Sequence, residues 1–241
     1  MTAMNDTRVV ILAGGKGTRL RPYTAVLPKP LMPIGEMPIL EVVLRQLKSA
    51  GFRKITLAVN HLADLMQAFF GDGSALGLEI SYCIENEPLG TAGCLSLVED
   101  LTDTFLVMNG DLLTTLDYAA MVLKHIDSKA AATIGVFTRE VRIDFGVVEV
   151  GRNEELLDYR EKPSFQYLVS MGVNVLDKSA LDFIRKGRYL DMPVLMLALK
   201  NAGKRVLSYR GDCEWLDIGR IDDYEMAIKA FEQSRQKYLR S

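Results

Sequence analysis

Glycines and cations follow the first apolar run of the chain at a spacing that suits phosphate binding. The run at residues 8–13 leads into Gly14, Gly15 and Gly17, and the stretch from Thr7 to Gly35 contains no acidic residue. Glycines after the first strand of an α/β sheet allow backbone N–H groups to approach phosphate oxygens. The pattern predicts a site for a multiply charged anion, against the alternative of a solvated basic loop. The cations of this stretch are Arg8, Lys16, Arg19, Arg21 and Lys29.

The two common phosphate-binding motifs do not fit these glycines. A dinucleotide fingerprint beginning at Gly15 needs glycine or alanine at position 20, which is Leu20, and a P-loop needs serine or threonine where Gly17 stands. The missing third glycine argues against a nicotinamide-dependent oxidoreductase. Prolines at positions 28, 30 and 33 stiffen the segment that carries Lys29 and favour a positioned charge there.

Asp111 could supply a metal ligand from its place after a predicted strand. Asp111 follows the apolar run 104–108 in the sequence Asn-Gly-Asp, and Asp217 lies between Trp215 and Gly219. An acid just beyond the carboxyl end of a strand faces the same crevice as the glycine-rich loop, and carboxylates together with phosphate oxygens suit Mg²⁺. Taken alone, the first motif is more often a turn, and the second is a helix-entry turn with a packed tryptophan.

Strand-like and helix-like patterns alternate in the first half of the chain. The strand-like runs are apolar along most of their length, as in a sheet that is covered on both faces. This alternation predicts an α/β fold with a doubly wound, mainly parallel mixed sheet. Strands are predicted for 8–13, 54–60, 78–85, 104–108 and 131–138, and helices for 38–50, 62–70, 91–101 and 116–129.

The alternation changes after residue 140. Runs at 145–150 and 156–161, separated by Gly-Arg-Asn-Glu, predict an antiparallel hairpin. We find no repeat and no linker-like segment, so residues 1–241 are interpreted as one domain. Further strands are predicted for 169–176 and 205–210, and further helices for 178–186, 192–201 and 221–236.

Composition excludes several classes of protein. The 241 residues carry 29 lysines and arginines against 31 acids, a net charge of −2, which gives no overall basic field for nucleic acid or anionic membranes. The longest nearly unbroken apolar stretch, 192–199, falls far short of the ~20 residues that span a bilayer. Cys83, Cys94 and Cys213 lack CxxC spacing and are interpreted as reduced, buried thiols. A cytoplasmic protein is expected.

The segment Gly14 to Thr24, followed by Pro28-Lys29-Pro30, resembles the signature of the sugar-1-phosphate nucleotidyltransferases, also called nucleoside-diphosphate-sugar pyrophosphorylases. The likeness extends over nearly the whole chain and is greatest to the mannose- and heptose-1-phosphate guanylyltransferase-like members. It implies a Rossmann-like nucleotidyltransferase fold, Mg²⁺ as cofactor, and a nucleoside triphosphate and a sugar 1-phosphate as substrates. The nucleotide-binding half would cover about residues 1–140 and the sugar-phosphate-binding half about 141–241.

The resemblance also implies roles for individual residues. Arg19, Lys29 and Asp111 would be catalytic, and Asp217 would join Asp111 on the metal. In Glu-Lys-Pro, Lys162 would bind the phosphate of the sugar phosphate and Glu161 the sugar hydroxyls. Gly146 would approach the sugar, and Asn174 would line the same pocket or cap a strand end. The nucleotide would contact Leu12, Ala13, Gly14, Gly15, Gly17, Thr18, Arg19, Glu87, Pro88, Gly90 and Thr91.

The segment from Glu85 to Gly93 resembles the nucleobase loop of this family, and Thr91 is placed to cap the following helix. Thymidylyl-transferring members usually have Gln-Pro here and often Asn after the metal aspartate, whereas this chain has Glu87 and Leu112. A carboxylate can accept both the N1–H and the N2–H₂ of guanine, whereas uracil and thymine offer one donor. GTP is therefore favoured.

Alternatives to this interpretation stay open. Uridylyl, cytidylyl or thymidylyl transfer is one alternative, and a catalytically silent regulatory subunit that binds nucleotide sugars is another, although the retained cations and acids argue against the second. Mannose, glucose, an amino sugar and a heptose all fit the motifs equally, and a homodimer is compatible with the sequence. His61 and His125 fall in no motif, so structural or surface roles are expected for both.

Overall fold

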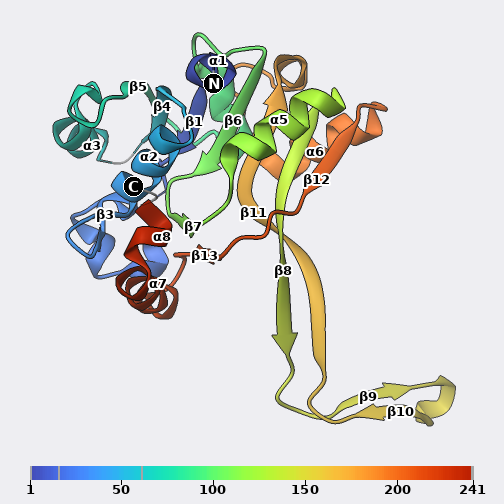
Figure 1. Ribbon diagram of the computed structural model, residues 1–241. Helices are drawn as coiled ribbons and strands as arrows, with labels where there is room; N and C mark the ends of the chain where they lie inside the picture. The colour runs from blue at the N-terminus through green and yellow to red at the C-terminus, as the bar shows by residue number, and fades with distance from the viewer. Residues whose placement is uncertain (1, 16, 61, 240–241) are drawn as a thin grey trace.

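The computed structural model describes residues 2–15, 17–60 and 62–239, and it is built around a mixed sheet of seven strands (Figure 1). Its order is β12-β8-β11-β6-β1-β4-β5. The neighbours of β1 run parallel to it, as β5 does to β4 and β12 to β8, whereas β11 is antiparallel to both β6 and β8. The strands are β1 (Val9–Leu12), β4 (Lys54–Val59), β5 (Glu79–Ile84), β6 (Thr104–Asn109), β8 (Ala132–Arg142), β11 (Ser164–Asp177) and β12 (Val206–Tyr209).

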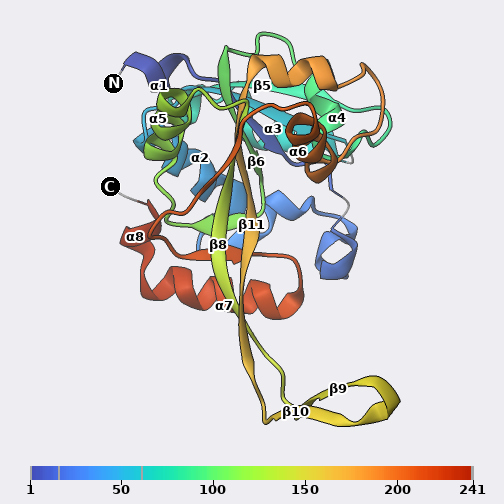
Figure 2. The same ribbon diagram turned by 90° about the vertical axis from the view of Figure 1, so that its right-hand side faces the viewer.

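Helices cover both faces of this sheet, which confirms the predicted doubly wound arrangement (Figure 2). One face packs against α2 (Ile39–Ser49), α3 (Ala63–Phe70) and α5 (Tyr118–Ser128), and the other against α4 (Gly90–Gly93) and α6 (Met192–Asn201). The short α1 (Thr2–Asp6) precedes the sheet. No helix in the described part of the chain is both long and apolar enough to cross a membrane.

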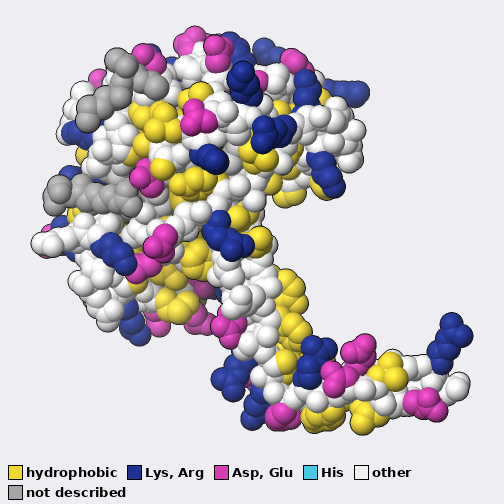
Figure 3. All heavy atoms as spheres, turned by 45° about the vertical axis from the view of Figure 1, so that its right-hand side comes forward, with side chains coloured by type: hydrophobic (Ala, Val, Ile, Leu, Met, Phe, Trp, Pro, Cys, Tyr) yellow, Lys and Arg dark blue, Asp and Glu magenta, His cyan; other side chains and the backbone are white. Residues whose placement is uncertain are grey.

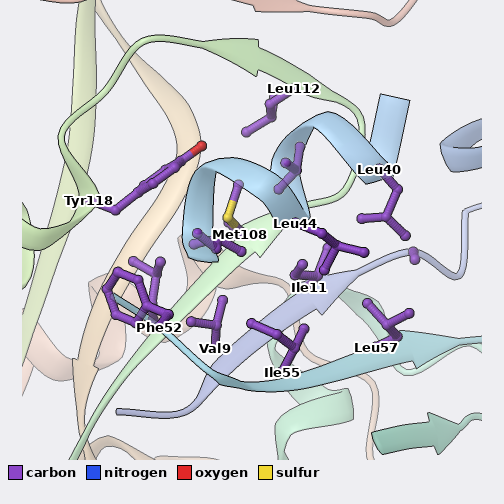
Figure 4. Close-up of a cluster of buried hydrophobic side chains, with 14 of the residues drawn as sticks. Val9, Ile11, Leu40, Leu44, Phe52, Ile55, Leu57, Met108, Leu112 and Tyr118 are labelled. Carbon is purple, nitrogen blue, oxygen red and sulfur yellow. The ribbon is translucent and has the colours of Figure 1, made fainter. Parts of the chain in front are cut away.

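The apolar character of the central strand follows from this double cover. On β1, Val9 and Ile11 belong to the core beneath α2, while Val10 belongs to the core on the opposite face. All three are fully buried, because successive side chains of a strand point to opposite faces. Figure 4 shows the first of these cores, in which Leu40 and Leu44 of α2 lie over Ile11 and Ile55.

A third core joins the N-terminal basic segment to the C-terminal helices. It contains Leu20, Met32 and Ile34 together with Ile218 and Phe231. This small layer therefore holds the N-terminal basic segment against the C-terminal helices. Its elements are β2 (Pro33–Ile34), β3 (Met37–Pro38), β7 (Leu112–Thr114), β13 (Trp215–Asp217), α7 (Ile221–Gln233) and α8 (Arg235–Leu239).

Several predicted elements differ in length or kind. The helix predicted for 178–186 is a 3₁₀ segment at Lys178–Phe183, because the Asp177 carboxylate accepts from the N–H and hydroxyl of Ser179 and closes a tight turn. The helix predicted for 91–101 shortens to α4 and a 3₁₀ turn, Cys94–Leu97. Glycines at both ends of α4 weaken helix propagation there. The last predicted helix, 221–236, divides at Ser234 into α7 and α8.

Two strands are longer than predicted, and their outer portions are exposed (Figure 3). β8 continues to Arg142 and β11 begins at Ser164, so the two form a ribbon that leaves the sheet (Figure 1). The predicted hairpin, β9 (Val147–Val150) with β10 (Leu156–Arg160), lies at the far end of this ribbon. We call residues 138–170 the arm.

Candidate active site

A cleft opens at the carboxyl ends of β1, β4 and β6, where parallel strands of an open sheet present their loops. Its volume is about 300 Å³. It lies beside the point at which the chain, having built β4 and β5 on one side of β1, returns to build β6 on the other. The described lining residues are Leu12, Ala13, Gly14, Gly15, Lys29, Pro30, Ala58, Asn60, Glu85, Pro88, Gly90, Thr91, Asn109 and Asp111.

The glycine-rich loop is shaped by close approaches of the backbone. A Cβ on Gly14 would lie 3.3 Å from the Asn60 Cβ and 3.4 Å from Glu85 Oε1, so the loop passes directly over the next two strands. Gly17 has a φ of +58°, and its carbonyl accepts a 2.7 Å hydrogen bond from the Thr24 hydroxyl. A Cβ there would lie 3.3 Å from the Lys29 Cβ, so the absent side chain leaves room for the lysine beneath the loop.

Asp111 is held against the end of β1 by the preceding glycine. The Gly110 N–H donates to the Leu12 carbonyl at 3.0 Å. The Lys29 ammonium donates to Asp111 Oδ2, and the two side chains are only 11% and 21% exposed. The other carboxylate oxygen, Oδ1, is buried with no hydrogen-bond partner among the described residues. Asp111, a lining residue of the cleft, is thus half satisfied, with one carboxylate oxygen left without a partner among the described residues.

A small ladder brings Asp217 to Asp111. β13 pairs antiparallel with β7 so that Asp217 lies opposite Leu112, and the Ile218 N–H donates to the Asp111 carbonyl at 3.2 Å. Burial raises the pKa of Asp217, and the Asp111 carboxylate raises it further, while Lys29 and Arg19 lower it. The structure therefore places both aspartates and both cations in one electrostatic cluster.

Arg19 reaches this cluster from the exposed side of the loop. A Cβ on Gly219 would lie 3.5 Å from Asp217 Oδ2, 3.6 Å from Arg19 Nη2 and 3.6 Å from Asp223 Oδ2. Asp223 was not among the predicted site residues. An acid in the first turn of a helix is an ordinary feature of helix starts, so its position carries no separate signal in the sequence.

The loop after β5 contributes a different glutamate from the one predicted to read the base. Glu87 is exposed and does not line the cleft, whereas Glu85 does. Glu85 Oε2 accepts from the Leu89 N–H at 2.9 Å, which leaves Oε1 facing Gly14. Burial raises the pKa of Glu85, partly offset by that N–H. Glu85 directly follows β5. A residue at the end of a predicted strand is a candidate for lining the cleft, so the sequence contained a signal for Glu85.

Thr91 lines the cleft but does not cap the helix that follows it, contrary to prediction. α4 begins at Gly90, so Thr91 lies inside the helix. Its hydroxyl instead accepts from the Met192 N–H at 2.7 Å, and its own N–H donates to Asp191 Oδ1 at 3.2 Å. The threonine thus satisfies the first N–H of α6, and the two short helices are joined at their starts.

The predicted sugar-phosphate residues are not brought to this cleft. Asn174 is buried within the sheet, where it lies opposite Val107 of β6. Glu161 and Lys162 are exposed near the end of the arm, and Gly146 lies there against the Tyr159 ring. Gly172 was not predicted as a site residue, yet it lies where the arm joins the sheet, and a Cβ on it would be 2.5 Å from Asn109 Nδ2.

Several other residues singled out in the sequence do not line this cleft. Arg8 precedes β1 at the opposite edge of the sheet, where its guanidinium donates to Thr56 and Ser81, so it is not part of the cation cluster. His125 is buried and shares a 2.8 Å hydrogen bond with the Thr133 hydroxyl, a structural role. Cys83 and Cys94 are buried, Cys213 is half-buried, and all three are free thiols. The predictions for Lys16 and His61 lie outside the described residues.

The donor set fits a hard divalent cation that binds together with phosphate. Mg²⁺ is commonly held by one or two carboxylates plus substrate oxygens rather than by a full protein cage. Asp111 Oδ1 is the orphaned buried oxygen that such an ion would satisfy, and Asp217 adds a second carboxylate. Within the described residues, no group of three or more histidines, cysteines, aspartates and glutamates forms a metal site, so phosphate oxygens would have to complete the shell.

The chain is similar in sequence and in structure to known proteins. The chain is 34% identical over 92% of its length to a UTP–glucose-1-phosphate uridylyltransferase of Synechocystis sp. and 32% identical over 92% to a mannose-1-phosphate guanylyltransferase of Mycobacterium tuberculosis. It spans 62% and 64% of the lengths of these relatives. The structure of HddC from Yersinia pseudotuberculosis superposes with a TM-score of 0.71 at 26% identity, covering 93% of this chain and 99% of that one.

The profile of the nucleotidyl transferase family matches residues 8–234, which include every strand of the main sheet, the glycine-rich loop and both aspartates. Because this match extends over nearly the whole chain and agrees with the relatives above, the chain belongs to the nucleotidyl transferase family.

Proposed function

We propose that this protein transfers a nucleotidyl group from a nucleoside triphosphate, preferably GTP, to a mannose- or heptose-like sugar 1-phosphate and releases pyrophosphate. The observation that carries the proposal is the convergence of Asp111, Asp217, Lys29 and Arg19 beside a glycine-lined cleft, of which Lys29 and Asp111 are lining residues. Two carboxylates and two cations in one cluster suit a reaction in which both substrates are polyanions.

The reaction needs positioning and charge neutralisation more than proton transfer. An oxygen of the sugar phosphate attacks the α-phosphorus in line, the bond to the β-phosphate oxygen breaks, and pyrophosphate leaves with the electron pair. Backbone N–H groups from Gly14 to Gly17 would cradle the triphosphate. Arg19 would stabilise the charge that grows on the leaving group, and Lys29 would neutralise the reacting phosphates.

Asp111 and Asp217 would hold Mg²⁺, which supplies Lewis-acid stabilisation of the α-phosphate oxygens when bound. Lys29 would then have two tasks. It would neutralise Asp111 in the free enzyme, and as a lining residue of the cleft it would interact with phosphate oxygens of the bound substrates. The low exposure of both side chains strengthens these interactions relative to water.

Guanine preference is supported by Glu85 rather than by the predicted Glu87. Glu85 Oε1 faces the glycine loop inside the cleft, at the edge away from the Asp111 cluster. When ionised, that carboxylate can accept a hydrogen bond from N1–H or N2–H₂ of guanine. The guanylyltransferase relative supports this preference. The uridylyltransferase relative makes uridylyl transfer the first alternative.

The proposal is tested by a pyrophosphate-release screen with Mg²⁺. GTP, UTP, CTP and dTTP are each combined with mannose, glucose, glucosamine and heptose 1-phosphates. We expect the highest kcat/KM for GTP with mannose or heptose 1-phosphate. A higher kcat/KM with another triphosphate would show that the enzyme transfers that nucleotide rather than a guanylyl group. No release with any pair, while nucleotide sugars still bind, would support a silent regulatory subunit instead.

A further inference from the structure

The buried side chain of Gln46 joins the short ladder between β7 and β13 to the helix α8. Gln46 lies on α2 and is only 7% exposed. Its amide nitrogen Nε2 donates to the Thr114 carbonyl of β7 at 2.7 Å and to the Tyr238 carbonyl of α8 at 2.8 Å. One amide group thus uses both of its N–H donors to fix a ladder strand and α8 against α2.

The amide oxygen of the same side chain shows which of its contacts matter. Gln46 Oε1 is buried with no hydrogen-bond partner among the described residues. A buried acceptor without a partner costs stability, and native proteins contain few of them. The favourable polar contribution of Gln46 therefore comes from the two bonds that its nitrogen donates.

Glu214 holds the other strand of the ladder to the same helix. It directly precedes β13, where its N–H donates to the Thr115 hydroxyl at 2.8 Å and its carbonyl accepts from the Thr115 N–H at 3.0 Å. Its carboxylate accepts from the Lys237 ammonium and, at 2.7 Å, from the Tyr238 hydroxyl. These two hydrogen bonds lower the pKa of Glu214. The helix α8, which lies beside β13 in Figure 1, is thus bonded to both sides of the ladder.

Tyr238 is the residue at which these contacts meet. It is 1% exposed and belongs to the third core, where its ring centroid lies 6.1 Å from that of Phe231. Its carbonyl accepts from Gln46 and its hydroxyl donates to Glu214. The backbone and the side chain of one buried residue therefore connect α2 to the start of β13, and bonds in such a network reinforce one another.

The ladder carries the two aspartates of the candidate site. The bonds to α2 and α8 hold the end of the ladder at which Thr114 pairs with Trp215. At the other end, Asp217 pairs with the residue that follows Asp111. Because the ladder has only three residue pairs, a change in its twist or register at one end displaces the other. Groups that orient metal ligands from outside typically contribute 10–100-fold to metal affinity.

We propose that Gln46 and Tyr238 are positioning residues, which hold the β7–β13 ladder through α8 and so set the spacing of Asp111 and Asp217 for a divalent cation. Neither residue lines the cleft, so each acts through the ladder. The effect on metal binding rests on the proposed function, whereas the support of the ladder by α8 does not.

Hydrogen–deuterium exchange followed by mass spectrometry tests the support of the ladder without substrates. Tyr238→Phe removes one hydroxyl and leaves the ring in the core, and Gln46→Met removes both donated bonds at similar size. We expect amide exchange in peptides covering 112–116 and 214–218 to be about two- to tenfold faster in each variant. Exchange in β1 and β4 should be unchanged. Wild-type exchange in the ladder of both variants would overturn the proposal.

Two further variants serve as controls. Tyr82→Phe removes a hydroxyl of the same kind, which donates to the Gly71 carbonyl at 2.8 Å from the edge strand β5. Lys237→Met removes an ion pair from α8 itself, but its two side chains are 53% and 48% exposed, and exposed pairs contribute little. We expect wild-type ladder exchange in both. Ladder exchange raised as much by either control as by Tyr238→Phe would contradict the proposal.

Metal affinity tests the consequence for the two aspartates. The dissociation constant of Mn²⁺ is measured without substrates from the electron paramagnetic resonance signal of the free ion, and KM for Mg²⁺ is measured in the pyrophosphate-release assay. We expect both to rise about tenfold in Gln46→Met, because the competent spacing is less populated, with kcat at saturating Mg²⁺ within a few-fold of wild type.

The outcomes separate this proposal from the proposed function. Faster ladder exchange with unchanged metal constants would show that Gln46 has only a structural role and would overturn the positioning of the aspartates. Faster ladder exchange and weaker Mn²⁺ binding, in a protein that releases no pyrophosphate with any substrate pair, would refute the proposed function and leave the positioning role in place.

Discussion

The Lys29 ammonium donates a hydrogen bond to the Asp111 carboxylate across 82 residues of sequence. Removing one partner of a buried ion pair leaves the other charge uncompensated, which costs more than replacing both. We expect Asp111→Asn to lower the free energy of unfolding by about 1–3 kcal/mol. The double variant Asp111→Asn/Lys29→Met should recover part of that loss. Urea denaturation measures both, and a double variant less stable than Asp111→Asn would contradict the pairing.

Arg19 and Arg21 provide a matched pair of exposed arginines in the same loop. Arg19 stands beside Asp217 at Gly219, so its loss should remove charge stabilisation at the reacting phosphates. We expect Arg19→Ala to lower kcat by about 10²–10³ with an unchanged circular dichroism spectrum. Arg21→Ala should stay within a few-fold of wild type. Equal effects of the two substitutions would remove Arg19 from the proposed machinery.

Gly172 is expected to be sensitive to a single methyl group. Its φ is +72°, and a Cβ would lie 2.5 Å from Asn109 Nδ2. Gly172→Ala should therefore be destabilising and displace the Asp111 loop, lowering kcat. Gly187→Ala is the control, because Gly187 has a φ of +67° but open space around it. A Cβ there strains the backbone without a clash, so the comparison isolates the effect of the contact with Asn109. Similar losses in kcat for both would show that the contact with Asn109 is unimportant.

Glu85 and Glu87 separate the two candidate contacts to the nucleobase. Glu85→Gln replaces a carboxylate that faces the cleft with an amide that can still accept from the Leu89 N–H. We expect it to lower kcat/KM for GTP by about tenfold or more, with a much smaller effect on UTP. Glu87→Gln should change neither. A selective loss of GTP turnover in Glu87→Gln would show that Glu87, as predicted from the sequence, contacts the nucleobase.

His125 should make stability depend on pH. Burial lowers the pKa of His125 below 6.5, opposed in part by Asp177. Because the unfolded chain then binds the proton more tightly, the free energy of unfolding should fall as the pH drops below 6.5 towards the lower pKa of the folded state. The wild type should lose stability from about pH 7.5 to about pH 5.5, and His125→Gln should lose less. An identical pH dependence in both proteins would exclude this residue as the cause.

Much of the fold could be predicted because local patterns agree with tertiary environment. β1 and α2 have apolar residues at the spacing their packing requires, so both were located to within a residue or two. The short α4 and the 3₁₀ turn at Lys178–Phe183 were misassigned, because helical spacing does not reveal how few turns are formed. Ladders as short as β7 with β13 leave no periodicity to detect.

Some residues of the candidate site could likewise be predicted from the sequence, and others could not. The residues at strand ends, Gly14 and Asp111, could be placed because the carboxyl edge of a parallel sheet gathers its loops. Glu85 was passed over for Glu87, because the strand predicted for 78–85 ended one residue too late and placed Glu85 inside the strand rather than after it. The arm was predicted only as a hairpin. Its length depends on pairing between β8 and β11, a non-local property that single-strand patterns do not encode.

The ladder between β7 and β13 has only three residue pairs, yet it fixes how far apart the two aspartates stand. Fraying of so short a ladder requires much less heat than melting of the seven-stranded sheet. Thermal inactivation should therefore precede the cooperative loss of secondary structure, as two separate events in a temperature scan. A ligand bridging both carboxylates would raise the lower of the two temperatures and leave the upper one nearly unmoved.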